Sequence, residues 1–84
     1  MVNNKAILVT GAAKRIGKAI ALNLAKSGYD IALNYNNSAE DALALSKQIE
    51  SLGVKCQLLQ ANLNKREQCV KLIEDAHRAF PSRL

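Results

Sequence analysis

Apolar residues along the chain alternate between short continuous runs and runs with helical spacing. Residues 5–10 (KAILVT) form a continuous apolar run, typical of a β-strand covered on both faces. Residues 30–35 (DIALNY) form a second run of strand length. Between them a helix is predicted to end at Gly28, which is placed to adopt the left-handed conformation of a helix C-terminus. The apolar residues that recur at helical spacing in it are Ile16, Ile20 and Leu24.

A second predicted helix follows the second strand. Ser38 is the expected N-cap, and Glu40 and Asp41 favour the first turn because carboxylates complement the helix dipole. Gly53 is expected to end this helix. Its expected buried stripe consists of Ala42, Leu45, Ile49 and Leu52.

The last third of the chain repeats the same order. Apolar and polar residues alternate over 54–58, which predicts a strand with one wetter side. Residues 64–67 (NKRE) have the pattern of a capping box, and Pro81 is expected to stop the helix that they begin. The expected apolar stripe of this third helix consists of Val70, Ile73 and Phe80, with His77 as a partly buried spacer between them.

The predicted order is therefore β-α-β-α-β-α, without repeats or linkers. Strands that alternate with helices favour parallel pairing and right-handed crossovers. We expect residues 1–84 to form one partial domain, the N-terminal half of a Rossmann-type doubly wound α/β sheet with strand order 3-2-1. The third strand suits a sheet edge. The first strand has the pattern of a central strand but would be paired on one side, which favours association with another chain or segment.

Composition narrows the functional classes. The chain has 84 residues, a net charge of +5 and no apolar run near the roughly 20 residues of a membrane span. Its start lacks the apolar core of a signal peptide, so we expect a cytoplasmic protein without membrane partners. Cys56 and Cys69 have no metal-ligand spacing and are expected to be reduced structural thiols. Basic residues do not cluster with aromatic ones, which argues against nucleic acid as a partner.

The segment VTGAAKRIGK, residues 9–18, is the candidate for chemistry. A loop between a strand and a helix N-terminus presents unpaired N–H groups and the positive end of the dipole, which together favour an anion. Gly11 permits the tight turn, Gly17 a close approach, and Lys14 and Arg15 add charge. The Walker A motif does not fit, because five residues separate Gly11 from Gly17 and no Ser or Thr follows Lys18.

The same segment resembles the TGxxx(G)xG pattern of the short-chain dehydrogenase/reductases, with Thr10, Gly11 and Gly17 in register. Arg15 stands at the middle glycine, and the loop is most similar to the TGAAKRIG of pteridine reductases. The similarity continues through residues 33–46 and loosely to the end of the chain. It implies a Rossmann fold and hydride transfer from NADPH to a pterin, a dihydropterin or a similar carbonyl or imine. Ketoacyl-type reductases, which keep the glycine, are the alternative within the family.

The residues also predict which dinucleotide is bound. NAD-selective sites place an acid about 20 residues after the glycines, but residues 34–38 (NYNNS) contain none. Arg15 is suited to a 2′-phosphate, so NADPH is expected over NADH. The resemblance implies an adenine contact at Asn62, where the family has Asp. The predicted cofactor-binding residues are Gly11, Lys14, Arg15, Ile16, Gly17, Tyr35, Asn36, Asn37, Ser38, Asn62 and Leu63.

The resemblance places the catalytic Ser, Tyr and Lys of the family in a part that comes after residue 84. We therefore expect no catalytic residue in this chain, and interpret it as the cofactor-binding N-terminal fragment of a reductase. Two hypotheses from other classes remain: a stand-alone module that binds nucleotides or assembles through its first-strand edge, and a basic nucleic-acid-binding domain. Concentration-dependent light scattering and salt-dependent polarisation assays distinguish them.

Overall fold

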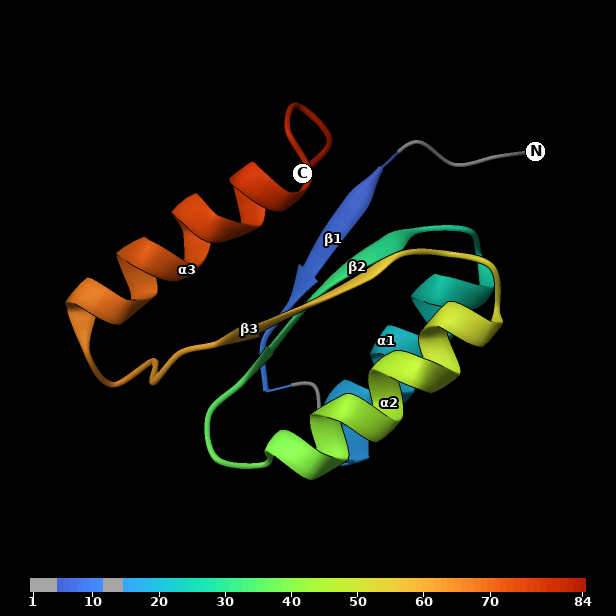
Figure 1. Ribbon diagram of the computed structural model, residues 1–84, viewed down its shortest axis with the longest axis horizontal. Coiled ribbons are helices and arrows are strands. Elements are labelled where there is room, and N and C mark those ends of the chain that lie inside the picture. The colour runs from blue at the N-terminus through green and yellow to red at the C-terminus, as the bar shows by residue number, and fades with distance from the viewer. Residues whose placement is uncertain (1–4, 12–14) are drawn as a thin grey trace.

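The computed structural model describes residues 5–11 and 15–84, and all their side chains except that of Arg15. Three strands and three helices alternate along the chain, as the sequence predicts (Figure 1). The elements are β1 (Ala6–Val9), α1 (Arg15–Lys26), β2 (Asp30–Tyr35), α2 (Ala39–Ser51), β3 (Cys56–Gln60) and α3 (Arg66–Ala79).

The strands form one parallel sheet in the order β1-β2-β3, which confirms the predicted arrangement and places β3 at an edge. Val9 pairs with Leu33, and Leu33 pairs with Leu58. Because all three strands run the same way, their carboxyl ends and the turns that follow them meet at one end of the sheet.

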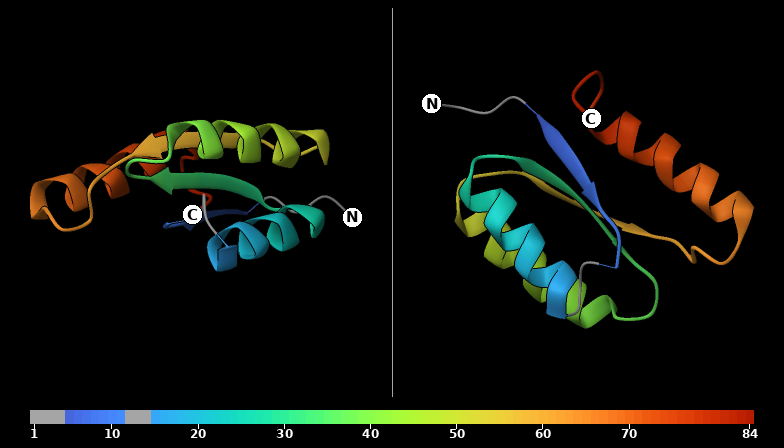
Figure 2. Two further views of the ribbon diagram at one scale, coloured as in Figure 1. Left: turned by 90° about the horizontal axis from the view of Figure 1, so that it is seen from below. Right: turned by 180° about the vertical axis from the view of Figure 1, so that it is seen from behind.

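Helices cover both faces of the sheet. Figure 1 and the two views of Figure 2 show α1 and α2 on one face and α3 on the other. In β2, Ile31 and Leu33 pack with α1 and α2, whereas Ala32 packs with α3. The residues that join them from the helices are Ala21, Ala25, Leu45 and Ile49 on the first face, and Ala76 with Phe80 on the second.

The isoleucines of α1 do not form its buried row, although Leu24 of the expected series is partly buried and packs against the core with Leu22. Ile16 is 77% exposed and Ile20 is 47% exposed, whereas Ala21 and Ala25 are buried. Alanine brings the helix backbone close to the sheet and to α2, and the row of isoleucines therefore lies off the contact face.

The predicted stripes of the other two helices are partly wrong. In α2, the C-cap Leu52 is exposed, because the helix ends at Ser51 before its last turn can carry this side chain to the core. In α3, Leu72 and Ala76 face the sheet instead of Val70 and Ile73, and His77 is exposed rather than partly buried. The residues that were predicted correctly as buried are Ala42, Leu45, Ile49 and Phe80.

Some of the predicted helix caps are present in the structure and others are not. Gly28 has a φ of +94° and, with Tyr29, donates back to the last turn of α1 at the carbonyls of Ala25 and Leu24, which is the Schellman arrangement. Ser38 is the N-cap of α2, but its side chain makes no capping hydrogen bond. The predicted capping box is wrong, because Lys65 rather than Asn64 is the N-cap of α3.

A buried carboxylate joins the amino ends of the strands. Asp30 begins β2 and accepts hydrogen bonds from the Lys55 N–H (2.7 Å) and from the Arg83 guanidinium (2.5 Å). The carbonyl of Arg83 in turn accepts the Ala6 N–H of β1 at 3.0 Å. Burial raises the pKa of the Asp30 carboxyl, but the Lys55 N–H and Arg83 lower it more, so this pKa lies below its ordinary value.

Replacing Asp30 by Asn tests this junction. We expect Asp30→Asn to lower the free energy of unfolding by about 1 kcal/mol at neutral pH, since Arg83 loses a charge-assisted partner. A carboxyl whose pKa is depressed on folding stabilises the protein above its unfolded pKa, near 3.8, and loses that effect as the pH falls through the lower folded value. Urea unfolding should therefore show the gap between wild type and variant closing below that pH.

Asp75→Asn is the matched control. Asp75 forms ion pairs with Lys71 and Arg78 on the surface of α3, at spacings of four and three residues. Exposed pairs of this kind contribute little, so its loss should be smaller. Equal losses for Asp30→Asn at neutral and acidic pH would contradict the role of the carboxylate.

Candidate functional site

The turn after β1 is built around Gly11. Its φ is +59°, in the left-handed region that glycine adopts without strain, and among the described residues other than its chain neighbours no heavy atom lies within 4 Å of the place that a Cβ would take. The open space means that a ligand can approach the backbone here. The Gly11 N–H donates to Asn34 Oδ1 at 3.3 Å, so this amide is directed at the protein.

The loop contains two predicted cofactor-binding cations, and the structure describes only the backbone of one of them. Lys14 lies outside the described residues, and so does the side chain of Arg15. The backbone of Arg15 is described and begins α1, so this residue stands at the positive end of the helix dipole. In the same first turn, Ile16 is exposed and Gly17 is half-buried.

Asn34 connects the turn to the end of β3. It is 2% exposed although its side chain is polar. Its Nδ2 donates to the carbonyls of Leu59 at 3.2 Å and Ala61 at 3.4 Å, and also to that of Tyr35 at 3.4 Å. Both ends of the amide are thus satisfied, as burial requires. Asn34 is not among the predicted site residues, although a polar side chain inside a buried strand is a signal that could have identified it.

The turns at the carboxyl end of the sheet enclose a hollow of about 230 Å³. Three predicted segments come together here: the turn after β1, the end of β2 and the turn after β3 (Figure 1). The described residues that line it include glycine and amide side chains but no carboxylate. They are Gly11, Asn34, Asn36, Ala61, Asn62, Leu63 and Asn64.

The turn after β3 is held by its own hydrogen bonds. Asn62 Oδ1 accepts the Asn64 N–H at 3.0 Å, and the Asn62 N–H donates to Gln68 Oε1 at 2.7 Å. The carbonyl of Leu63 accepts the thiol of Cys69 at 3.2 Å, while its side chain is 44% exposed. One lone pair of the Asn62 oxygen is therefore already in use, and its second lone pair and its NH₂ group remain for a ligand.

The turn after β2 contributes the remaining predicted residues. Gln60 Nε2 donates to the carbonyl and to the Oδ1 of Asn36, both at 3.2 Å, which fixes Asn36 beside the hollow. Asn37 is exposed, and Tyr35 and Ser38 are half-buried. None of these three lines the hollow, so of the predicted residues that the structure describes it brings Gly11, Asn36, Asn62 and Leu63 together.

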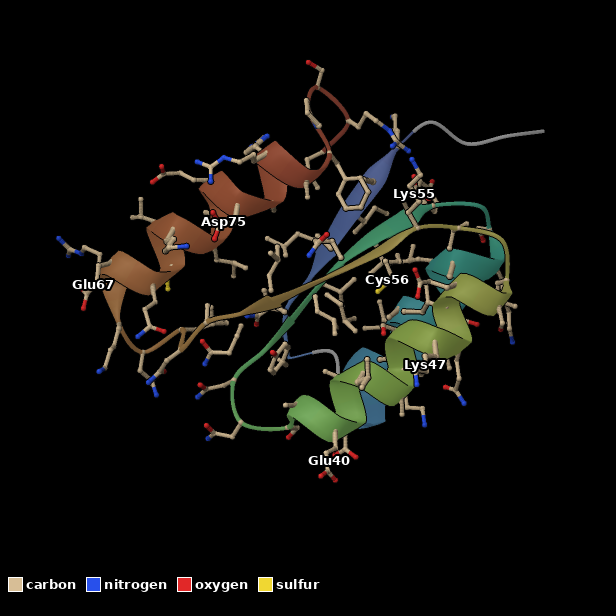
Figure 3. The ribbon with its side chains drawn as sticks, in the orientation of Figure 1. Glu40, Lys47, Lys55, Cys56, Glu67 and Asp75 are labelled. Carbon is tan, nitrogen blue, oxygen red and sulfur yellow. The ribbon has the colours of Figure 1, made fainter. Side chains whose placement is uncertain are left out.

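The nearest acids in sequence point elsewhere. Asp30 lies at the amino end of β2, bonded to Lys55 and Arg83. Glu40 and Asp41 are exposed in the first turn of α2, and Figure 3 shows Glu40 pointing away from the sheet. The described side chains that line the hollow are therefore neutral, and none of them is a carboxylate that would repel an anion.

Other chemistry finds little support in the described part of the chain. No three His, Cys, Asp or Glu side chains gather there as a metal site. Burial raises the pKa of the Cys56 thiol to about 12, which makes it a poor nucleophile, and Figure 3 places it on the side of α1 and α2. The helices described are also too short or too polar to cross a bilayer.

Comparison with known proteins assigns the family. Residues 5–84 match the family described as short chain dehydrogenase. The chain belongs to this family. It is 40% identical over 79 residues to the 3-oxoacyl-[acyl-carrier-protein] reductase FabG of Staphylococcus epidermidis, an alignment that covers 94% of the chain and 32% of the relative.

Solved structures of the family have the same fold. The FolM alternative dihydrofolate reductase 1 of Brucella suis, in complex with NADP, superposes with a TM-score of 0.84 at 35% identity, over 95% of this chain and 32% of that one. Acetoin dehydrogenase of Enterobacter cloacae gives a TM-score of 0.86 at 27% identity, over 92% and 31%. The chain thus spans about a third of the length of the relatives that it matches.

Proposed function

We propose that this chain binds NADP(H) at the carboxyl end of its sheet, and that it is the cofactor-binding N-terminal part of a reductase. The observation that carries the proposal is the hollow between the turns after β1, β2 and β3, which amide side chains line without a carboxylate among its described residues. The complex of the Brucella suis relative with NADP supports it.

The residues present fit the adenosine end of this cofactor. The open space beside Gly11 lets a bulky group approach the backbone, and α1 begins close by with its positive dipole end. Asn36 and Asn62 present NH₂ donors and exposed amide surface to the hollow. Leu63 offers apolar area to a base at its rim.

Arg15 is the proposed partner of the 2′-phosphate. It is the first residue of α1, directly after the loop that resembles TGAAKRIG. A guanidinium pairs with a phosphate through two parallel hydrogen bonds. Lys14, Tyr35, Asn37 and Ser38 complete the proposed set around the same phosphate and ribose, with Ile16 and Gly17 in the first turn of the helix.

Nucleotide fragments test this selectivity. Titration calorimetry should give tighter binding of 2′,5′-ADP than of 5′-AMP. In Arg15→Ala most of that preference should vanish, a loss of about 1–3 kcal/mol for a charge-assisted contact. Lys47→Ala is the matched control, because Lys47 is an exposed cation on α2, a helix that contributes no residue to the hollow. Equal binding of the two nucleotides by the wild type would overturn the proposal.

The proposed reaction is hydride transfer to a pterin, a dihydropterin or a similar carbonyl or imine. Bound NADPH supplies the hydride, and the side chains of this chain hold the adenosine end of the cofactor. The Brucella suis reductase and the Arg15 loop favour a pterin-like substrate. The second candidate is a 3-oxoacyl thioester, which the 40% identity to the Staphylococcus epidermidis reductase favours.

Substrate assays separate these candidates. The 84-residue chain alone should show no NADPH oxidation with either substrate class, because the resemblance to the family implies that its catalytic Ser, Tyr and Lys belong to a later part of the family's length. A longer polypeptide that carries this segment together with the rest of the family's length should reduce dihydropterins faster than 3-oxoacyl thioesters. Faster reduction of the thioester would favour the ketoacyl-type reaction instead.

Self-association is also proposed, through β1 and α3. The Asp30 N–H donates to the Lys5 carbonyl, so the Ala6 N–H points away from β2, toward Arg83. Beside this outer edge lies a groove of about 380 Å³. Its lining is mainly apolar and consists of Ala6, Ile7, Leu8, Ile73, Ala76, His77 and Leu84. Burial of such surface favours association.

Sedimentation at several concentrations tests the association. We expect the mean mass of the 84-residue chain to rise with concentration, and Ile73→Lys to suppress the rise, since Ile73 is 52% exposed in the groove. Leu43→Lys is the control, because Leu43 is 49% exposed on α2 outside the groove. A wild type that stays monomeric throughout would refute this interface.

A further inference from the structure

We propose that Asn34 is a positioning residue, whose amide holds the two walls of the hollow at the spacing that the nucleotide requires. The inference rests on the proposed function, since it concerns the same site. It starts from the Gly11 N–H, which Asn34 Oδ1 accepts at 3.3 Å, and from the carbonyls of Leu59 and Ala61, to which Asn34 Nδ2 donates.

These hydrogen bonds join two turns whose strands are not neighbours in the sheet. Gly11 belongs to the turn after β1, and Ala61 to the turn after β3, and β2 separates the two strands in the sheet. Gly11 and Ala61 both line the hollow. A single side chain from the central strand therefore sets how far apart the two turns lie, and it also orients the peptide at which the glycine loop begins.

A purely packing role does not explain an amide at this position. Asn34 is buried on the same side of β2 as Ala32, where the neighbouring core residues are apolar. Leucine has a similar size and would fill this space without the cost of burying a polar group. The amide is explained by what it bonds, because it offers the acceptor that Gly11 needs and the donor that the two carbonyls need.

The chemistry also distinguishes Asn from Asp. A carboxylate at position 34 would still accept the Gly11 N–H but would face the carbonyls of Leu59 and Ala61 with no proton to donate. It would also place a negative charge beside the proposed phosphate site. Protonation of that carboxyl restores a donor and removes the charge, and burial raises its pKa toward neutrality.

Asn34→Leu and Asn34→Asp test the inference, with Ser46→Ala as the matched control. Ser46 is a buried polar residue of α2 whose hydroxyl donates to the Leu43 carbonyl at 2.8 Å, outside the hollow. Two properties are measured while each variant is folded: the affinity for 2′,5′-ADP by calorimetry, and the exchange rate of the Gly11 amide by NMR without nucleotide.

We expect Asn34→Leu to bind 2′,5′-ADP about tenfold more weakly and to exchange the Gly11 amide at least about fivefold faster. Asn34→Asp should bind weakly near pH 8, and its deficit relative to wild type at the same pH should shrink toward pH 5, at roughly the values where a buried carboxyl gains its proton. Ser46→Ala should match the wild type in both measurements. If Asn34→Leu does not fold, the pH dependence of 2′,5′-ADP binding by Asn34→Asp tests the positioning role instead.

The failures are distinguishable. A wild type that binds 2′,5′-ADP while the folded Asn34 variants bind it equally well, at every pH, would overturn the positioning role and leave the proposed function intact. An unchanged Gly11 exchange rate in Asn34→Leu would also overturn it. A wild type that binds neither 2′,5′-ADP nor NADPH would overturn the proposed function together with this inference.

Discussion

The structure depends on β2 being paired along both edges and covered on both faces. Ile31, Ala32 and Leu33 are each fully buried, and their alternation sends side chains to the two helical layers in turn. A one-residue slip in the register of β2 would exchange these faces. The packing on both faces therefore fixes the register of β2 against β1 and β3. The turns after β1 and β3 are placed relative to each other through this strand.

The two polar residues near the ends of β2 join different parts of the fold. At the amino end, Asp30 is charged and joins β3 to the turn that follows α3. At the carboxyl end, Asn34 is neutral and joins the turns on either side of it. The carboxylate of Asp30 thus lies at the end of β2 opposite the hollow, where it joins these segments without repelling an anionic ligand at the other end.

The sequence was sufficient for the elements and their order, because the change from strand to helical periodicity is strong at every boundary. It was insufficient for the buried faces of α1 and α3. The prediction followed large side chains such as Ile16 and Ile73, but these are exposed, and the buried residues of the two helices include Ala21, Ala25 and Ala76, which permit closer packing. Alanine is frequent on every face of a helix, so the sequence pattern does not show which alanines pack against the sheet.

The candidate site was predictable to the extent that it follows from topology. Gly11, Asn36 and Asn62 come directly after parallel strands, so they meet at one end of the sheet whatever their side chains are. Hydrogen-bond partners were not predictable in this way. The Asn64 N–H, which the expected capping box would direct at Glu67, donates instead to Asn62 Oδ1, and Asn34 reaches carbonyls 25 and 27 residues away.

In the proposed NADP(H) site, selectivity between the two dinucleotides would depend on the sign of the charge near the 2′-phosphate. Two unit charges 4 Å apart interact by about 4 kcal/mol at the effective dielectric constant near a protein surface, or about a thousandfold in affinity. A single carboxylate at the end of β2 would therefore outweigh several neutral hydrogen bonds. Asn36 holds that place with an amide fixed by Gln60, so an arginine at the start of α1 meets no competing acid among the described residues of the hollow.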